Sequence, residues 1–201
     1  ICLVITPLIA LMKDQVQNLL QRNIKALAIH SGMSRDEISI ALGNCIYGDY
    51  KFLYLSPERL ATELFKFRVR NMNVNLLAID EAHCISQWGY DFRPSYLKIA
   101  ELRKLLPEVP ILALTATATK AVANDIMERL EFKNGVLLSK SFERKNLVYL
   151  VRQTEDKYKE MLKIATGIDG SGIIYVRNRR KTKDIKDFLV ENGISAENYH
   201  A

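Results

Sequence analysis

Short apolar runs alternate with longer amphipathic segments over the first two thirds of the chain. The runs are rich in aliphatic side chains and lie at residues 1–5, 26–29, 52–55, 74–79 and 111–114. Runs this short and continuous are typical of strands buried on both faces of a parallel sheet. The segments between them carry apolar residues at helical spacing, so the pattern predicts a doubly wound α/β domain.

Several of the predicted helices have recognisable first residues. The helices are expected to cover about 8–22, 35–45, a segment from 57 onward, 97–106 and 121–130. Ser34 and Glu37 have the spacing of a capping box, in which each residue satisfies a backbone N–H of the other. Ser56 followed by Pro57 predicts a helix with Ser56 as its cap, because proline fits the first helical position. Thr119 is expected to cap the helix after it.

The pattern loosens after residue 132 and resumes near residue 148. Apolar runs at 148–151 and 173–176 predict two more strands, and helices are expected over 156–165 and in the segment that ends at Gly193. We therefore predict a first domain over 1–140, a linker over 141–147 and the beginning of a second α/β domain over 148–201.

Composition narrows the class of protein only moderately. The 201 residues are 48% hydrophobic and 26% charged, which is typical of globular domains, and the net charge of +6 suits a polyanionic partner without requiring one. The three cysteines are widely spaced and predict neither a disulfide framework nor a zinc site. This cysteine usage indicates a reducing intracellular compartment. The sequence also shows no secretory signal or membrane span. Because the chain opens at Ile1 within a predicted strand, we expect it to be a fragment.

Two adjacent carboxylates follow the apolar run at 74–79. In parallel sheets, ligands bind just outside the carboxyl ends of the strands, where Asp80 and Glu81 are expected to emerge. One carboxylate there can hold a nucleotide-bound magnesium ion, and its neighbour can position or deprotonate an attacking water. The alternative is that the pair only stabilises the beginning of a helix through the helix dipole.

An aromatic-rich segment follows these carboxylates. Its aromatic residues alternate irregularly with polar residues and glycine; they are Trp88, Tyr90, Phe92 and Tyr96. The spacing fits neither a helix nor a strand, which predicts an exposed loop whose rings stack on nucleic-acid bases without sequence preference. Arg93 adds a phosphate or cation–π contact. The alternative is ordinary core packing of the aromatic rings.

Residues 80–94, Asp-Glu-Ala-His followed by Cys-Ile-Ser-Gln-Trp-Gly-Tyr-Asp-Phe-Arg-Pro, resemble the Walker B motif and aromatic-rich loop of RecQ-family DNA helicases. The resemblance covers essentially the whole chain and implies RecA-like lobes of the P-loop NTPase type. It implies that Asp80 binds Mg²⁺, that Glu81 activates water and that His83 connects the ATP site to the loop. It also implies that single-stranded DNA is contacted by Gln87, Trp88, Phe92 and Arg93.

Other segments resemble further motifs of the same family. The segment 6–16 resembles motif Ia, which implies that Thr6 and Lys13 contact the DNA backbone; the alternative for Thr6 is a helix cap. The segment 56–59 resembles motif Ib, with Arg59 as a DNA or inter-motif contact, or simply a residue at a surface helix start. Thr115 and Thr117 lie in a segment that resembles motif III, whose hydroxyl groups couple the acidic motif to DNA-facing loops, although the same run also suits a strand-to-helix turn.

A basic segment follows the apolar run at 173–176. With Arg179, residues 172–175 resemble motif IV, which implies a DNA contact for Arg179, although Arg177 and Asn178 depart from the usual residues there. The cluster of arginines and lysines over 177–186 suits phosphate binding. A solvated helix face explains the same cluster equally well.

The resemblance implies the motor fragment of an ATP-dependent 3′-to-5′ DNA helicase acting in DNA repair and recombination. Its cofactors are ATP and Mg²⁺, with zinc possible only outside this chain, and its partners are single-stranded and duplex DNA, with the oligomeric state open. The chain has no Gly-x-x-x-x-Gly-Lys-Ser/Thr loop, so we expect it to be inactive by itself. The location implied is the cytoplasm and nucleoid of a bacterium or a nucleus. The alternatives are a related translocase or RNA-dependent ATPase, and a non-catalytic DNA-binding or scaffolding module.

Overall fold

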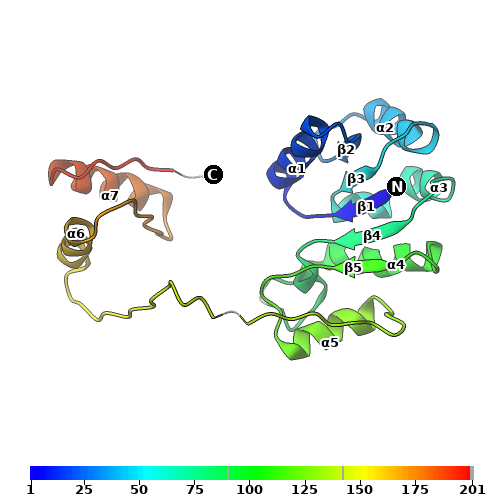
Figure 1. Cartoon of the computed structure of the whole chain (residues 1–201). Coiled ribbons are helices and arrows are strands. Elements are labelled where there is room, and N and C mark those ends of the chain that lie inside the picture. The colour runs from blue at the N-terminus through cyan, green and yellow to red at the C-terminus, as the bar shows by residue number, and fades with distance from the viewer. Residues whose placement is uncertain (90, 142, 200–201) are drawn as a thin grey trace. The chain divides into compact units, whose positions relative to one another are not determined.

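The computed structural model describes residues 1–89, 91–141 and 143–199 and separates the chain into two compact units. The first unit spans Ile1–Ser139 and the second spans Lys140–Ala201. Tyr90 of the predicted aromatic loop and one residue of the predicted linker, Phe142, lie outside the described part. Each unit is considered by itself below (Figure 1).

Within the described part of the first unit, parallel strands form a five-stranded sheet in the order β2-β3-β1-β4-β5. The strands are β1 (Cys2–Ile5), β2 (Ala26–Ile29), β3 (Phe52–Leu55), β4 (Leu76–Ile79) and β5 (Ile111–Ala113). Every strand coincides with a predicted apolar run, and the α/β fold class is confirmed. The central strands β3, β1 and β4 are apolar at consecutive positions because they are covered on both faces. In the edge strand β5, by contrast, Leu112 is 45% exposed.

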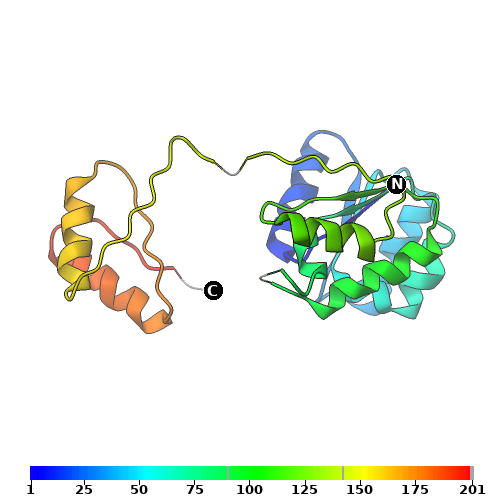
Figure 2. The same ribbon diagram turned by 90° about the horizontal axis from the view of Figure 1, so that it is seen from below.

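Helices pack around this sheet (Figure 2). The α-helices are α1 (Ile9–Gln21), α2 (Arg35–Tyr47), α3 (Glu63–Val69), α4 (Leu97–Leu105) and α5 (Lys120–Arg129). Three short 3₁₀ helices are described as well, namely η1 (Pro57–Ala61), η2 (Ala82–Ile85) and η3 (Pro94–Tyr96). The core includes Leu3, Leu53 and Leu77 of three neighbouring strands, each at most 1% exposed.

Two of the three predicted helix caps are confirmed. The Ser34 hydroxyl accepts from the Glu37 N–H at 3.2 Å, and the Glu37 carboxylate accepts from the Ser34 N–H at 2.7 Å. Thr119 accepts from a backbone N–H at the start of α5. The prediction for Ser56 is wrong: its side chain makes no capping bond, and the segment after it is the 3₁₀ helix η1. Ser56 is buried at the end of β3, where its carbonyl accepts from the Arg59 N–H at 3.0 Å.

The second unit consists of two helices, α6 (Lys157–Gly167) and α7 (Arg179–Glu191), and extended segments. An edge-to-face contact between Tyr158 and Phe188 joins the helices, with ring centroids 5.0 Å apart. Gly193 follows α7 with φ +81°, and the N–H of Ile194 bonds back to the helix at 2.9 Å, so the predicted glycine stop is confirmed.

The strands predicted at 148–151 and 173–176 are not formed in the described part of this unit. Val151 is fully exposed, and Ile173 is 80% exposed. A strand exists only when its backbone hydrogen-bonds to a neighbouring strand, and these segments have none among the described residues. The two predicted strands are therefore wrong, because they were predicted from apolar composition alone.

None of the helices in the described residues is long and apolar enough to cross a bilayer.

Candidate active site at the carboxyl edge of the sheet

The adjacent strands β1 and β4 bring Thr6 and Asp80 together at their carboxyl ends. The ladder continues one residue past β4, since the Asp80 N–H donates to the Ile5 carbonyl at 2.8 Å. The strand order changes direction at this point: the chain leaves β1 toward β2 and β3, and later returns on its other side as β4 and β5. Ligands of open α/β sheets bind at such a switch point. The predicted position of the carboxylate at the sheet edge is confirmed.

The Asp80 carboxylate is fixed by two hydrogen bonds. Its Oδ2 accepts from the Thr6 hydroxyl at 3.1 Å, and its Oδ1 accepts from the Glu81 N–H at 2.9 Å. The backbone is anchored too, because the Tyr96 hydroxyl donates to the Asp80 carbonyl at 2.9 Å. Carboxylate oxygens carry further lone pairs, and a carboxylate beside a hydroxyl is the oxygen-rich donor set that Mg²⁺ prefers. The residues at this position fit the predicted metal.

The structure gives Thr6 a different partner from the predicted one. Thr6 was expected to contact the DNA backbone, yet it is 1% exposed and its hydroxyl binds Asp80. Burial directly after β1 leaves the hydroxyl no direct access to a ligand outside the site. In this conformation Thr6 orients the carboxylate.

Glu81 adopts an unusual backbone conformation. Its φ of 48° and ψ of 42° lie in the left-handed region, which residues other than glycine rarely enter. Such strain is concentrated at functional sites, where the surrounding structure holds it in place. The left-handed turn begins η2 and leaves the Glu81 Oε2 3.2 Å from His83 Nδ1, while the Glu81 side chain stays 36% exposed. The carboxylate can therefore touch both a buried imidazole and solvent.

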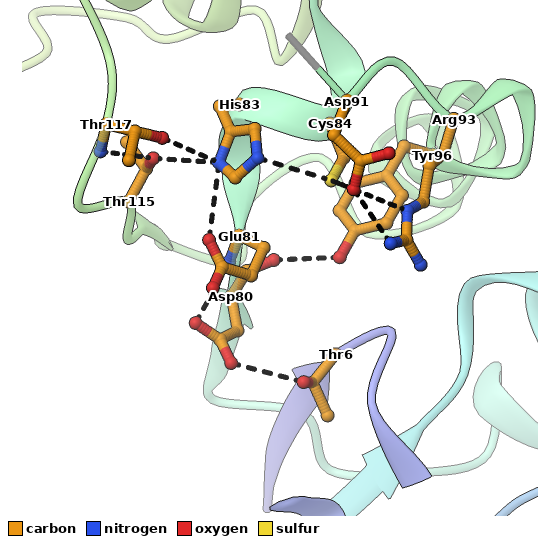
Figure 3. A network of polar contacts seen from close by, with 10 residues as sticks. All are labelled: Thr6, Asp80, Glu81, His83, Cys84, Asp91, Arg93, Tyr96, Thr115 and Thr117. Carbon is orange, nitrogen blue, oxygen red and sulfur yellow. Dashed lines mark hydrogen bonds and ion pairs between the residues drawn. The ribbon is translucent and has the colours of Figure 1, made fainter. Parts of the chain in front are cut away.

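His83 lies at the centre of the polar network in Figure 3. It is 2% exposed, and its Nδ1 faces the hydroxyls of Thr115 at 3.1 Å and Thr117 at 3.4 Å as well as the Glu81 carboxylate. A protonated Nδ1 donates to the carboxylate, and an unprotonated Nδ1 accepts from a hydroxyl. Through this one ring nitrogen His83 contacts both Glu81 and the threonine segment. The structure therefore brings together the three residues that the sequence predicts to couple the motifs, His83, Thr115 and Thr117.

The aromatic segment presents its central part to solvent. Trp88 is 80% exposed and Gln87 is exposed, whereas Phe92 and Arg93 are half-buried. The prediction of an exposed loop is wrong for Tyr96, because its side chain is 0% exposed. Its ring packs in the core because its hydroxyl has a partner there, the Asp80 carbonyl. For Tyr96 the alternative of core packing holds.

Both ends of this loop are tied to each other. The Arg93 N–H donates to the Cys84 carbonyl at 2.9 Å, and the Arg93 guanidinium contacts Asp91 Oδ2 at 2.7 Å. That guanidinium holds the pKa of the Asp91 carboxyl below its usual range. Gly89 approaches the His83 carbonyl so closely that an added Cβ would lie 2.6 Å from the oxygen. The position therefore requires glycine, and the loop closes over η2.

The remaining predicted DNA contacts are Lys13, Arg59 and Arg179, which belong to separate elements. The segments with Thr6 and Arg59 meet at a cavity of about 270 Å³, which is lined by Pro7, Ile9, Ser31, Ser56, Glu58, Arg59 and Thr62. Arg59 is half-buried, and its Nη2 donates to the His30 carbonyl at 2.9 Å, which is an inter-segment contact. Lys13 is exposed on α1, and Arg179 is exposed at the first turn of α7 in the second unit.

Sequence reasoning missed three contributors to this site. It did not assign Cys84 or Asp91 any role, and it did not place the Tyr96 hydroxyl on Asp80. The pairing of His83 with Cys84 and Asp91 has no recognised ligand spacing, so no sequence signal could have found it. Tyr96 carried one available signal, since it begins the apolar face of the helix that follows.

Comparison with known proteins gives consistent matches. The family model described as DEAD/DEAH box helicase matches residues 1–126. The chain is 40% identical over 200 residues to "ATP-dependent DNA helicase RecQ" of Pasteurella multocida and 41% identical over 200 residues to the protein of that name in Bacillus subtilis. It spans about a third of these relatives: 32% of the first and 34% of the second, with 99% and 98% of this chain covered. The similarity to RecQ helicases predicted from the sequence is confirmed.

Solved structures support the fold. The chain is similar to the crystal structure of the DUF1998 helicase MrfA, with a TM-score of 0.66 at 17% identity, covering 96% of this chain and 31% of that one. It is also similar to Mycobacterium smegmatis helicase Lhr bound to ssDNA and AMP-PNP, with a TM-score of 0.54 at 16% identity, covering 98% of this chain and 29% of that one. At these identities the likeness concerns the fold alone.

Proposed function

The chain belongs to the DEAD/DEAH box helicase family, and from this premise we propose that it forms part of the motor of a longer ATP-dependent DNA helicase of the RecQ type. In this proposal ATP hydrolysis drives 3′-to-5′ translocation on single-stranded DNA and the separation of duplexes. The unit Ile1–Ser139 is a first RecA-like lobe, and the residues after the linker begin a second one. The proposed location of the protein is the bacterial nucleoid or the nucleus, where its DNA substrate lies.

One observation carries the proposal. The site at the sheet edge and the loop with exposed Trp88 are joined by contacts through a single buried residue, His83. One side of its imidazole faces Glu81, and the other side faces Cys84, whose thiol lies 3.8 Å from Asp91 in the loop. When DNA binding changes the conformation of the loop, these contacts can transmit the change to the Glu81 carboxylate, which positions the attacking water.

The residues take distinct roles in this motor. Asp80 would hold the Mg²⁺ of a bound nucleotide, and Thr6 orients the Asp80 carboxylate for this role. Glu81 positions and deprotonates the attacking water, for which its partial exposure and contact with His83 are suited. When bound there, the metal ion would neutralise charge that develops on the phosphate. Thr115 and Thr117 hydrogen-bond to His83 when it leaves Glu81. Trp88, Phe92 and Arg93 contact the single-stranded DNA.

Two variants of the longer protein test the proposal in one assay of DNA-stimulated ATP hydrolysis. Glu81→Gln keeps the shape and removes the base, so hydrolysis is expected to fall by about 10²-fold or more while nucleotide binding persists. Trp88→Ala is expected to leave hydrolysis without DNA unchanged and to reduce its stimulation by DNA. Tyr47→Ala is the matched control, since this aromatic is 86% exposed on α2, away from the site.

The outcomes separate the candidate functions. Hydrolysis that survives Glu81→Gln removes the base from the mechanism. Stimulation by DNA that survives Trp88→Ala removes the loop from DNA sensing. Stimulation by RNA but not DNA identifies an RNA-dependent ATPase, and DNA binding without any hydrolysis identifies a non-catalytic module.

A further inference from the structure

Three side chains with different donor atoms converge beside the catalytic edge, and the function proposed above assigns them no ligand. His83, Cys84 and Asp91 place one nitrogen, one sulfur and one oxygen within 4.8 Å of one another, the one such group found in the described part of the chain. Cys84 Sγ is 3.8 Å from His83 Nε2 and 3.8 Å from Asp91 Oδ2. His83 and Cys84 are buried, and Asp91 is half-exposed, so the cluster is reachable from one side.

These separations suit a tetrahedral metal ion. Bonds of about 2.3 Å to sulfur and about 2.0 Å to nitrogen place the two donors about 3.5 Å apart around zinc. The observed sulfur–nitrogen distance of 3.8 Å needs only a small contraction. Three protein ligands leave a fourth position for water, and the exposed side of Asp91 is where that water would lie.

A second observation points to a metal independently of the distances. Metal-binding histidines almost always direct their other ring nitrogen to a carboxylate or another hydrogen-bond acceptor, which fixes the tautomer. The Nδ1 of His83 lies 3.2 Å from the Glu81 carboxylate, while the Nε2 faces the thiol. The outer-shell partner of a zinc-binding histidine is therefore already in place (Figure 3).

We propose that His83, Cys84 and Asp91 form a binding site for a zinc ion, separate from the magnesium position at Asp80. The donor sets distinguish the two ions: sulfur and imidazole suit borderline-soft Zn²⁺, whereas Asp80 and Thr6 offer only oxygen. On binding, the Cys84 thiol proton leaves to solvent and the thiolate becomes the ligand. The site does not depend on the helicase function proposed above.

Zinc binding changes two contacts. The Asp91 carboxylate must turn partly away from Arg93, and this ion pair is 39% and 43% exposed, so its loss is weakly opposed. Zinc on Nε2 keeps the proton on Nδ1 and therefore holds His83 against Glu81. Because the ligands lie on both sides of Trp88 in the chain, the ion ties the ends of the loop together and restrains it.

The chain carries its own reporter for this site. Trp88 is the single tryptophan in the sequence and lies between Cys84 and Asp91. Zinc chloride titrated into the reduced 201-residue chain is expected to change Trp88 fluorescence with a stoichiometry of one ion. Cadmium chloride is expected to produce a thiolate-to-metal charge-transfer absorption with the same stoichiometry, and a chelator should reverse both signals.

Matched variants locate the ligands. Cys84→Ser should abolish the charge-transfer band, and Asp91→Asn should weaken zinc binding at least about tenfold, the effect of losing even an outer-shell partner. Asp49→Asn is the control, since this carboxylate also pairs with a basic residue two positions later, Lys51, but has no sulfur nearby. Binding by this control should equal that of the unchanged chain.

Two results would overturn the site. The first is a charge-transfer band that persists in Cys84→Ser, which would place the metal on Cys2 or Cys45. The second is an affinity that Asp91→Asn leaves unchanged. Asp91 is half-exposed, so its variant is expected to fold and decides the question even where Cys84→Ser, a change in the core, does not.

Discussion

At the scale of single residues, the site depends on side chains that hold others in place. Asp80 accepts hydrogen bonds from Thr6 and from the Glu81 N–H, and its carbonyl accepts from Tyr96. These three partners need not bind the Mg²⁺ proposed at Asp80. Together they restrict the orientation of the Asp80 carboxylate. Preorganisation of this kind means that little rearrangement is needed when charge develops at the site.

Tyr96→Phe tests one of these partners. The ring remains packed, but the partly buried Asp80 carbonyl loses its donor at 2.9 Å, so the free energy of unfolding should fall by about 1 kcal/mol. Urea denaturation of the chain, followed by circular dichroism, measures the change. Tyr47→Phe serves as the control because Tyr47 is 86% exposed. Equal midpoints for the two variants would show that the hydroxyl contributes nothing.

At the scale of elements, local sequence and tertiary contacts contribute differently to the helix starts. The capping box of α2 is formed by Ser34 and Glu37 alone, so two residues at a spacing of three determine it. The segment after Ser56 has an equally good local signal, but Ser56 is buried at the end of β3, and η1 forms in place of an α-helix. A local rule holds where the residue faces water and is overridden where it is buried.

The capping box has a pH signature. The N–H and hydroxyl of Ser34 hold the pKa of Glu37 below its ordinary value of 4.5. A lowered folded-state pKa means that Glu37 stabilises α2 fully above 4.5 and loses this effect as pH falls through the folded-state value. The difference in unfolding free energy between the chain and Glu37→Gln should therefore shrink in acid, as measured by urea denaturation at neutral pH and well below pH 4.

Ser34→Ala completes this test. It removes the cap of α2 and should lower the unfolding free energy by about 1 kcal/mol at neutral pH. A difference for Glu37→Gln that is constant across the pH range would contradict the bond between the Glu37 carboxylate and the Ser34 N–H.

At the scale of the whole molecule, the sheet brings together residues that are distant in sequence. Thr6, Asp80 and Thr115 follow three neighbouring strands, and parallel pairing places their ends at one edge. The chain supplies carboxylates and hydroxyls at that edge but contains no Gly-x-x-x-x-Gly-Lys-Ser/Thr segment to hold phosphates. The site as described offers oxygen ligands, but the chain has no phosphate-binding lysine of this motif.

The 201-residue chain by itself is therefore expected to hydrolyse ATP negligibly, with or without DNA. Without a phosphate-binding lysine, charge in the transition state is not neutralised, and turnover falls by orders of magnitude. Phosphate release from the purified chain, with single-stranded DNA present and absent, measures this. DNA-stimulated release that disappears in Glu81→Gln would overturn the expectation.

The sequence by itself determined the five strands of the sheet, because each is a short continuous apolar run, and it placed Asp80 and Glu81 at the edge, because they directly follow β4. It went wrong at 148–151 and 173–176, where apolar residues met no partner strand among those described. Only the tertiary structure decided that Thr6 serves Asp80, that Tyr96 is buried, and that His83, Cys84 and Asp91 converge. These facts depend on strand order and loop closure, which join residues whose separation along the chain carries no periodic signal.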